Sequence, residues 1–135
     1  MRHLDLDPEV ETWTDLRDRS KGSLGSAELL FVGGGSTFRL LHHVRSHGFV
    51  DAVRDFVAAD GDYYGGSAGA ILACEDVAIA LQLDPNEGGL RDLSSLGLVR
   101  EFSVFPHFTP TLVAESQSWS ALSGSAAASF GVAAA

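Results

Sequence analysis

The feature that most constrains the fold is a short apolar run that ends in three consecutive glycines. Residues 29–32 read Leu-Leu-Phe-Val, and residues 33–35 are all glycine. An unbroken apolar run of this length predicts a strand buried on both faces, as in a parallel sheet covered by helices. Ser36 is a typical N-cap residue, so we expect a helix to follow the glycines and to end at Gly48.

The same order of strand, turn and helix recurs further along the chain. Tyr63 and Tyr64 predict a short strand, which runs into Gly-Gly-Ser-Ala-Gly at 65–69 and then into an apolar helix. Between the two units, an apolar stripe at helical spacing predicts another helix (Phe49, Val53, Phe56 and Val57). A further strand is predicted at 102–105. Strands that alternate with helices predict an α/β sandwich with a mostly parallel sheet.

Three other segments complete the expected organisation. Asp7 as N-cap and Pro8 in the first turn predict a helix over residues 8–19, and residues 77–83 suggest another strand. Residues 118–135 are mostly Ser, Ala and Gly, which predicts a loosely ordered tail or a weak terminal helix. We therefore expect one α/β domain over residues 1–117, followed by a tail at 118–135.

Charge and cysteine content limit the classes of function. Nine Lys and Arg stand against eighteen Asp and Glu in 135 residues, a net charge of −9, so the chain repels phosphate backbones and anionic lipids. Nucleic acid and membranes are therefore not expected partners. Cys74 is the single cysteine, which suits a reducing compartment. The N-terminus lacks the apolar stretch of a signal peptide, and we expect a cytoplasmic protein.

Ser67 stands in the pattern G-x-S-x-G between a predicted strand and a predicted helix. A sharp turn that lifts a serine hydroxyl out of the backbone needs small neighbours, and the helix start offers amides to a developing oxyanion. Ser67 is therefore a candidate nucleophile, with the amide of Ala68 as an oxyanion donor. The alternative is a glycine-rich connection that only packs a helix closely on a strand.

The glycines at 33–35 close another strand at another helix start. Ligands in open α/β sheets bind outside the carboxyl ends of the strands, so the amides around Gly34 and Gly35 are candidates for the second half of an oxyanion hole. A phosphate-binding loop does not fit, because the segment lacks both G-x-G-x-x-G spacing and a G-K-[ST] ending. Close packing alone is the other interpretation.

His107 follows Pro106 at the end of a predicted strand, which brings it to the same sheet edge as Ser67. A serine nucleophile needs a base, and imidazole is the usual one. The histidines at 42, 43 and 47 lie along a helix, where a solvated face explains them. An esterase of the α/β-hydrolase type does not fit, since its histidine comes late and no histidine follows His107.

Three segments together resemble the peptidase E family, the S51 serine peptidases: residues 30–41, residues 66–70 and residues 106–109. The resemblance covers about residues 27–110, and it implies a three-layer α/β/α sandwich of the class I glutamine-amidotransferase-like type. It further implies Ser67 as nucleophile, His107 as base, and oxyanion donors at Gly34, Gly35 and Ala68. No metal or cofactor is implied, and the substrates would be short peptides, notably dipeptides with an N-terminal aspartate.

The chain also departs from this family. Members extend further at both ends, so the sandwich is expected to be incomplete at both ends, and a later glutamate orients their histidine. Asp84, in Leu83-Asp84-Pro85, resembles an Asp-Pro of the family and is our expected acid, with Glu115 as a second candidate. Uncovered edges predict self-association. The alternative to an enzyme is a weak or inactive family member that acts as a binding or self-associating module.

Overall fold

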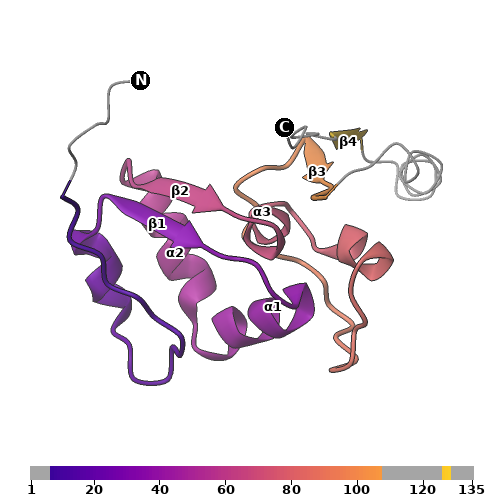
Figure 1. Cartoon of the computed structure of the whole chain (residues 1–135), viewed down its shortest axis with the longest axis horizontal. Coiled ribbons are helices and arrows are strands. Elements are labelled where there is room, and N and C mark those ends of the chain that lie inside the picture. Colours follow the sequence, from indigo (N-terminus) through magenta and orange to yellow (C-terminus); the bar gives the residue numbers. More distant parts are fainter. Residues whose placement is uncertain (1–6, 108–125, 129–135) are drawn as a thin grey trace.

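The computed structural model describes residues 7–107 and 126–128 (Figure 1). Its centre consists of two units in which a strand, a glycine turn and a helix follow one another. The elements in chain order are η1 (Lys21–Ser26), β1 (Leu29–Val32), α1 (Thr37–Ser46), α2 (Phe49–Ala58), β2 (Asp62–Gly65), α3 (Ala68–Leu72), η2 (Ala78–Gln82), β3 (Phe102–Val104) and β4 (Ala126–Ala128).

The strands form two parallel pairs. β1 pairs with β2 in a register that sets Leu29 opposite Asp62 and Val32 opposite Gly65, and β3 pairs with β4. This is the expected α/β class with parallel strands. β4 falls within the predicted tail, so residues 126–128 are a strand and not a loose or helical segment. The rest of residues 118–135 lies outside the described part of the chain.

Helices α1 and α2 lie on one side of the β1–β2 pair (Figure 1). Leu30, Val32 and Tyr63 point to that side and pack against the core. Phe31 and Tyr64 point the other way, are 60% and 64% exposed, and stack with ring centroids 5.6 Å apart. The prediction of burial on both faces is therefore wrong for β1 in the described structure, because no helix of residues 7–107 covers its second face.

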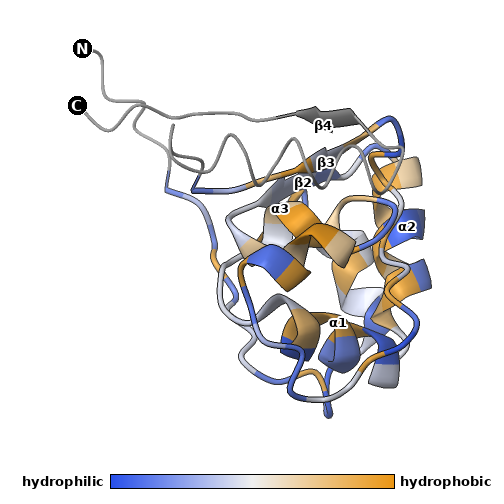
Figure 2. Ribbon diagram, turned by 90° about the vertical axis from the view of Figure 1, so that its right-hand side faces the viewer, coloured by the Kyte–Doolittle hydropathy of each residue, from blue (hydrophilic) through white to orange (hydrophobic). Residues whose placement is uncertain are grey.

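The core forms where the three helices meet behind the sheet, as the apolar segments in Figure 2 show. Its members in α1 and α2 recur at three- and four-residue spacing (Phe38, Leu41 and Val44; Phe49, Val53 and Phe56), and α3 adds the adjacent residues Ile71 and Leu72. Gly48 separates α1 from α2 with a φ of 69°, a left-handed conformation that glycine adopts readily. Among the described residues, no helix is both long and apolar enough to cross a membrane.

Residues 8–19 form an irregular segment and not the predicted helix. The Leu16 N–H donates to Nε2 of His43 at 3.0 Å, and the Arg17 N–H donates to the side chain of Asp15 at 2.9 Å. Such side-chain acceptors compete with helical hydrogen bonds. The contact with Leu16 also means that His43 does not lie on a solvated face, whereas His42 is exposed.

Residues 77–83 are also not a strand, because Ala78–Gln82 form the 3-10 helix η2. The Asp76 carboxylate accepts the N–H of Ala78 at 2.8 Å and starts the turn. Val77, Ile79 and Ala80 are all fully buried. A short apolar run of this kind has no periodicity that separates strand from helix.

Candidate active site

The backbone at Ser67 is held in a conformation that is rare for a residue with a side chain. Ser67 joins β2 to α3 with φ 51° and ψ −111°. Glycines on both sides make this turn fit: a Cβ at Gly69 would lie 2.1 Å from the carbonyl oxygen of Val32, and one at Gly65 would lie 2.6 Å from the backbone of Gly69. The strained serine between two obligatory glycines is the geometry of a nucleophile turn.

The side chain of Tyr63 makes a hydrogen bond to this turn, a contact that was not predicted from the sequence. Its hydroxyl donates to the carbonyl oxygen of Gly69 at 2.7 Å. Burial raises the pKa of the Tyr63 phenol, with a further contribution from Cys74, so the hydroxyl stays protonated as a donor. The sequence could have indicated this contact, because neighbouring residues of a strand point to opposite faces and one of the two tyrosines therefore faces the core. A buried tyrosine hydroxyl usually finds a hydrogen-bond partner.

The structure brings Ser67 and His107 together. Oγ of Ser67 lies 2.9 Å from Nε2 of His107, although the two residues are 40 positions apart. His107 is the third residue after the end of β3 and directly follows Pro106, and its own φ is 56°. The serine is half-buried and the histidine is exposed, so an incoming molecule can reach the pair.

The glycine turn after β1 lies against the same serine. A Cβ at Gly34 would lie 3.3 Å from Cβ and 3.7 Å from Oγ of Ser67, so the backbone of this turn passes beside the nucleophile. Gly35 follows with φ 130°, a value that L side chains rarely adopt. Ala68, the third expected donor, is the first residue of α3 and is buried. The two predicted glycine turns therefore converge on one place.

Asp84 has a different contact from the expected one. Its Oδ2 accepts hydrogen bonds from both the N–H and the Oγ1 hydroxyl of Thr37, each at 2.9 Å. Thr37 is fully buried at the start of α1, just after the glycine turn. Within residues 7–107 and 126–128, no carboxylate is hydrogen-bonded to His107. Glu115, the second candidate acid, lies outside the described residues.

The fold and the site together define an α/β protein with a Ser–His pair at the carboxyl end of parallel strands. The model of peptidase family S51 matches residues 3–126. The chain belongs to this family.

Individual relatives agree with that assignment. Peptidase E of Salmonella newport (strain SL254) is 38% identical over 93 residues, which are 67% of this chain and 38% of the relative. An uncharacterised peptidase of Pasteurella multocida (strain Pm70) is 30% identical over 107 residues, 78% of this chain and 49% of the relative. A crystal structure from Listeria monocytogenes EGD-e, of a protein assigned to peptidase E, superimposes with a TM-score of 0.68 at 25% identity.

These matches also show a difference in length. The chain spans less than half of each of these two curated relatives. The superposition covers 82% of this chain and 55% of the Listeria protein. The residues that the family model matches include both glycine turns and the Ser–His pair.

Proposed function

We propose that this protein is a serine peptidase that hydrolyses short peptides through an acyl-enzyme on Ser67. The observation that carries the proposal is the 2.9 Å contact between Oγ of Ser67 and Nε2 of His107, made at a strained turn between two glycines whose Cβ positions are blocked by the backbone. A serine next to a base within hydrogen-bond reach is the arrangement of an activated nucleophile. Membership of peptidase family S51 supports a peptide as the substrate.

The chemistry follows from that contact. Oγ of Ser67 attacks the scissile carbonyl carbon while Nε2 of His107 accepts the hydroxyl proton. His107 then gives this proton to the leaving amine, and an acyl-enzyme remains on Ser67. A water molecule then attacks the acyl carbon while the same imidazole takes its proton; the bond to Oγ of Ser67 breaks, His107 returns the proton to Oγ, and the carboxylic acid leaves. Each step uses groups of the chain and water alone, so the mechanism requires no cofactor or metal.

The negative charge on the carbonyl oxygen needs donors, and we assign these to the backbone at Gly34, Gly35 and Ala68. The contact of Gly34 with Ser67 and the start of α3 at Ala68 support this assignment. Loss of one such donor typically lowers kcat by about 10²- to 10³-fold. Because Gly34 passes close to the side chain of Ser67, a larger residue there would also crowd the nucleophile.

The contact at Asp84 favours a second candidate function. A triad that lacks its acid typically turns over about 10⁴-fold more slowly, and Asp84 holds Thr37 instead of His107. A weak or inactive family member that binds peptides without fast turnover is therefore the alternative. Under either function, we propose that Asp84 is a positioning residue that fixes the start of α1 and, through it, the glycine turn beside Ser67.

Hydrolysis of a peptide panel tests the proposal. Asp-Xaa dipeptides, which the family resemblance implies, are compared with Ala-Xaa dipeptides, and free amino acids are quantified by mass spectrometry. We expect the wild-type chain to release product and Ser67→Ala to release none, with an unchanged circular dichroism spectrum. Product release by Ser67→Ala at the wild-type rate would remove Ser67 from the mechanism. Specific peptide binding without release by a folded wild-type protein would favour the binding module.

A further inference from the structure

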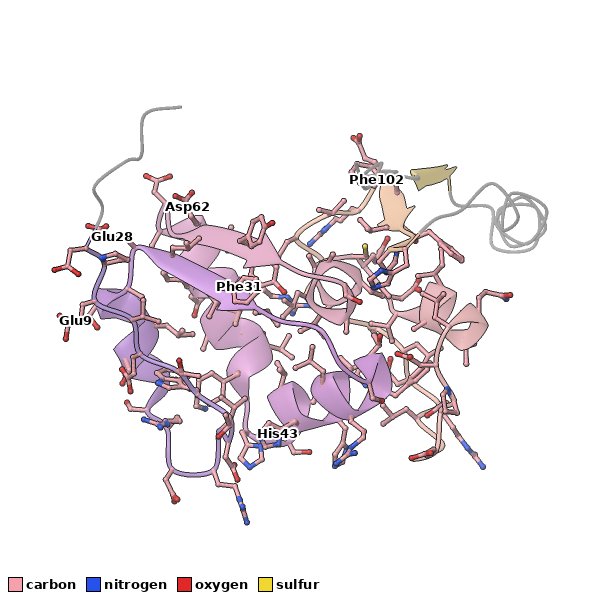
Figure 3. The ribbon with its side chains drawn as sticks, in the orientation of Figure 1. Glu9, Glu28, Phe31, His43, Asp62 and Phe102 are labelled. Atoms are coloured by element: carbon pink, nitrogen blue, oxygen red, sulfur yellow. The ribbon has the colours of Figure 1, made fainter. Side chains whose placement is uncertain are left out.

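A second group of ligand-type side chains lies at the C-terminal half of α1. His43 and His47 are one helical turn apart, and Asp15 reaches them from the irregular segment 8–19. One ligand atom from each of the three lies within 4.8 Å of the others, and all three residues are half-buried. Figure 3 shows His43 at the lower side of the molecule, away from Phe102 on β3. The cluster is therefore separate from the Ser67 site.

Among the described residues, hydrogen bonding leaves Nε2 of His47 without a donor, whereas the lone pair of His43 Nε2 accepts a backbone N–H. Nδ1 of His47 lies 2.8 Å from the carbonyl oxygen of His43, which can only accept, so Nδ1 is the donor and Nε2 carries the lone pair of the neutral ring. Metal-binding histidines are commonly oriented by this kind of bond to a carbonyl. Nε2 of His43 accepts the N–H of Leu16, so this nitrogen is unprotonated as well.

The third side chain supplies negative charge at the same place. Oδ1 of Asp15 lies 3.7 Å from Nε2 of His43. Hydrogen bonds from the side chain and the backbone of Arg17 orient this carboxylate. The Arg17 side chain donates to Oδ2, whereas Oδ1, on the side of the histidine, accepts the Arg17 backbone N–H and keeps a further lone pair.

We propose that Asp15, His43 and His47 bind one divalent transition-metal ion of the zinc type. Two imidazole nitrogens and one carboxylate oxygen suit Zn²⁺, with a water as the fourth ligand, whereas Mg²⁺ and Ca²⁺ prefer oxygen ligands alone. Ligand atoms of a tetrahedral zinc site lie about 3.3 Å apart, as follows from bonds of about 2.0 to 2.1 Å. The Asp15–His43 distance is near this value, so closure needs a small movement of His47 and the release of the Leu16 N–H.

Such an ion would cross-link segment 8–19 to the C-terminal end of α1. Trp13 and Leu16 of this segment already pack against the core, and the indole of Trp13 meets Phe49 edge-on at 6.0 Å. Because the metal joins two parts of the chain that only the folded state brings together, its binding energy adds to the stability of the fold. The site acts on stability and not on the chemistry at Ser67.

Zinc affinity of the whole, chelator-treated chain tests this inference. Competition with a chromophoric chelator, in excess Mg²⁺ to suppress unspecific attraction to the acidic surface, gives stoichiometry and affinity. We expect one Zn²⁺ per chain, with binding at least about tenfold weaker in His47→Gln and in Asp15→Asn. His42→Gln is the matched control, because His42 lies on the same helix but outside the cluster, and we expect wild-type affinity.

A thermal scan gives an independent readout. Zinc should raise the melting temperature of the wild type and of His42→Gln, and should leave that of His47→Gln unchanged, while all three melt alike in chelator. His3→Gln tests whether His3, which lies outside the described residues, contributes a zinc ligand. Wild-type affinity in both His47→Gln and Asp15→Asn, loss of binding in His3→Gln alone, or no zinc binding by the folded wild type would overturn the proposal.

Discussion

At the scale of single residues, the site depends on backbone shape as much as on side chains. Ser67 has a positive φ, and two glycines whose Cβ positions are blocked stand on either side of it. The packing of α3 on β1 and β2 stabilises this strained conformation, because the backbone of Gly69 lies directly against Val32. The hydroxyl is thereby presented to His107, as a nucleophile turn requires.

Gly69→Ala tests this packing. A Cβ placed 2.1 Å from the carbonyl oxygen of Val32 forces α3 away from β1, and we expect a loss of about 1 to 3 kcal/mol in the free energy of unfolding. Urea denaturation measures the change. Gly88→Ala is the matched control, since its Cβ meets nothing within 4 Å, and we expect it to stay within about 0.5 kcal/mol of the wild type. Equal stability of the two variants would contradict this account of the turn.

Asp84→Asn distinguishes two roles for one carboxylate. The amide oxygen of asparagine can still accept from the N–H and the hydroxyl of Thr37, so we expect stability and hydrolysis rate to remain near wild type. Asp84→Ala removes the acceptor and should cost about 1 kcal/mol, as the loss of a helix cap does. A fall in kcat of about 10⁴ in a stable Asp84→Asn protein would instead make Asp84 the acid that orients His107.

At the scale of elements, the segments with strong local signals were predicted correctly. The strand at 29–32, the two helices that follow it and the strand at 102–104 appear where apolar periodicity and glycine placed them. The convergence of the two glycine turns also followed from the rule that strand ends of a parallel sheet share an edge. Burial of the second face of β1 was not predictable in this way, because it depends on what covers the sheet.

Two of the differences from expectation come from side chains that bind distant parts of the chain. Segment 8–19 carries helix signals, but His43 takes the N–H of Leu16 from 27 positions away. Asp84 was expected beside His107, and its partner Thr37 is 47 positions away. Local sequence carries no information on which of two distant partners a carboxylate will meet, so these contacts require the structure.

Tyr63→Phe tests how β2 supports α3. Loss of the bond to the Gly69 carbonyl should destabilise the fold by about 1 kcal/mol. Tyr64→Phe is the control, because the Tyr64 ring is exposed and, within the described structure, its hydroxyl makes no hydrogen bond.

The same tyrosine predicts a pH dependence of stability. Since the pKa of Tyr63 is raised in the folded state, its contribution to the free energy of unfolding is present below about pH 10 and decreases above it, where the tyrosine of the unfolded chain ionises. The wild type should therefore lose stability above about pH 10 more steeply than Tyr63→Phe, and parallel curves would contradict this.

At the scale of the whole molecule, one sheet face remains apolar and open in the described structure. Leu29, Phe31 and Tyr64 are each more than half exposed on this face. A strand pair of this kind favours pairing with another chain. The self-association expected from the sequence therefore stays a prediction.

Light scattering coupled to size-exclusion chromatography measures this self-association directly. We expect the wild-type chain to elute with a mass above 14.2 kDa and Phe31→Ser to shift toward the monomer. Val10→Ser is the control, because Val10 is 75% exposed but lies in the N-terminal segment. A monodisperse wild-type monomer would count against the prediction.

The central claim is that Ser67 is an activated nucleophile, and covalent labelling tests it most directly. The folded chain is incubated with a fluorophosphonate and its intact mass is measured for wild type, His107→Gln and Ser67→Ala. We predict a single adduct on the wild type, much slower labelling of His107→Gln because the base is lost, and no adduct on Ser67→Ala. A folded wild type that acquires no adduct, or an adduct that persists in Ser67→Ala, would contradict the account.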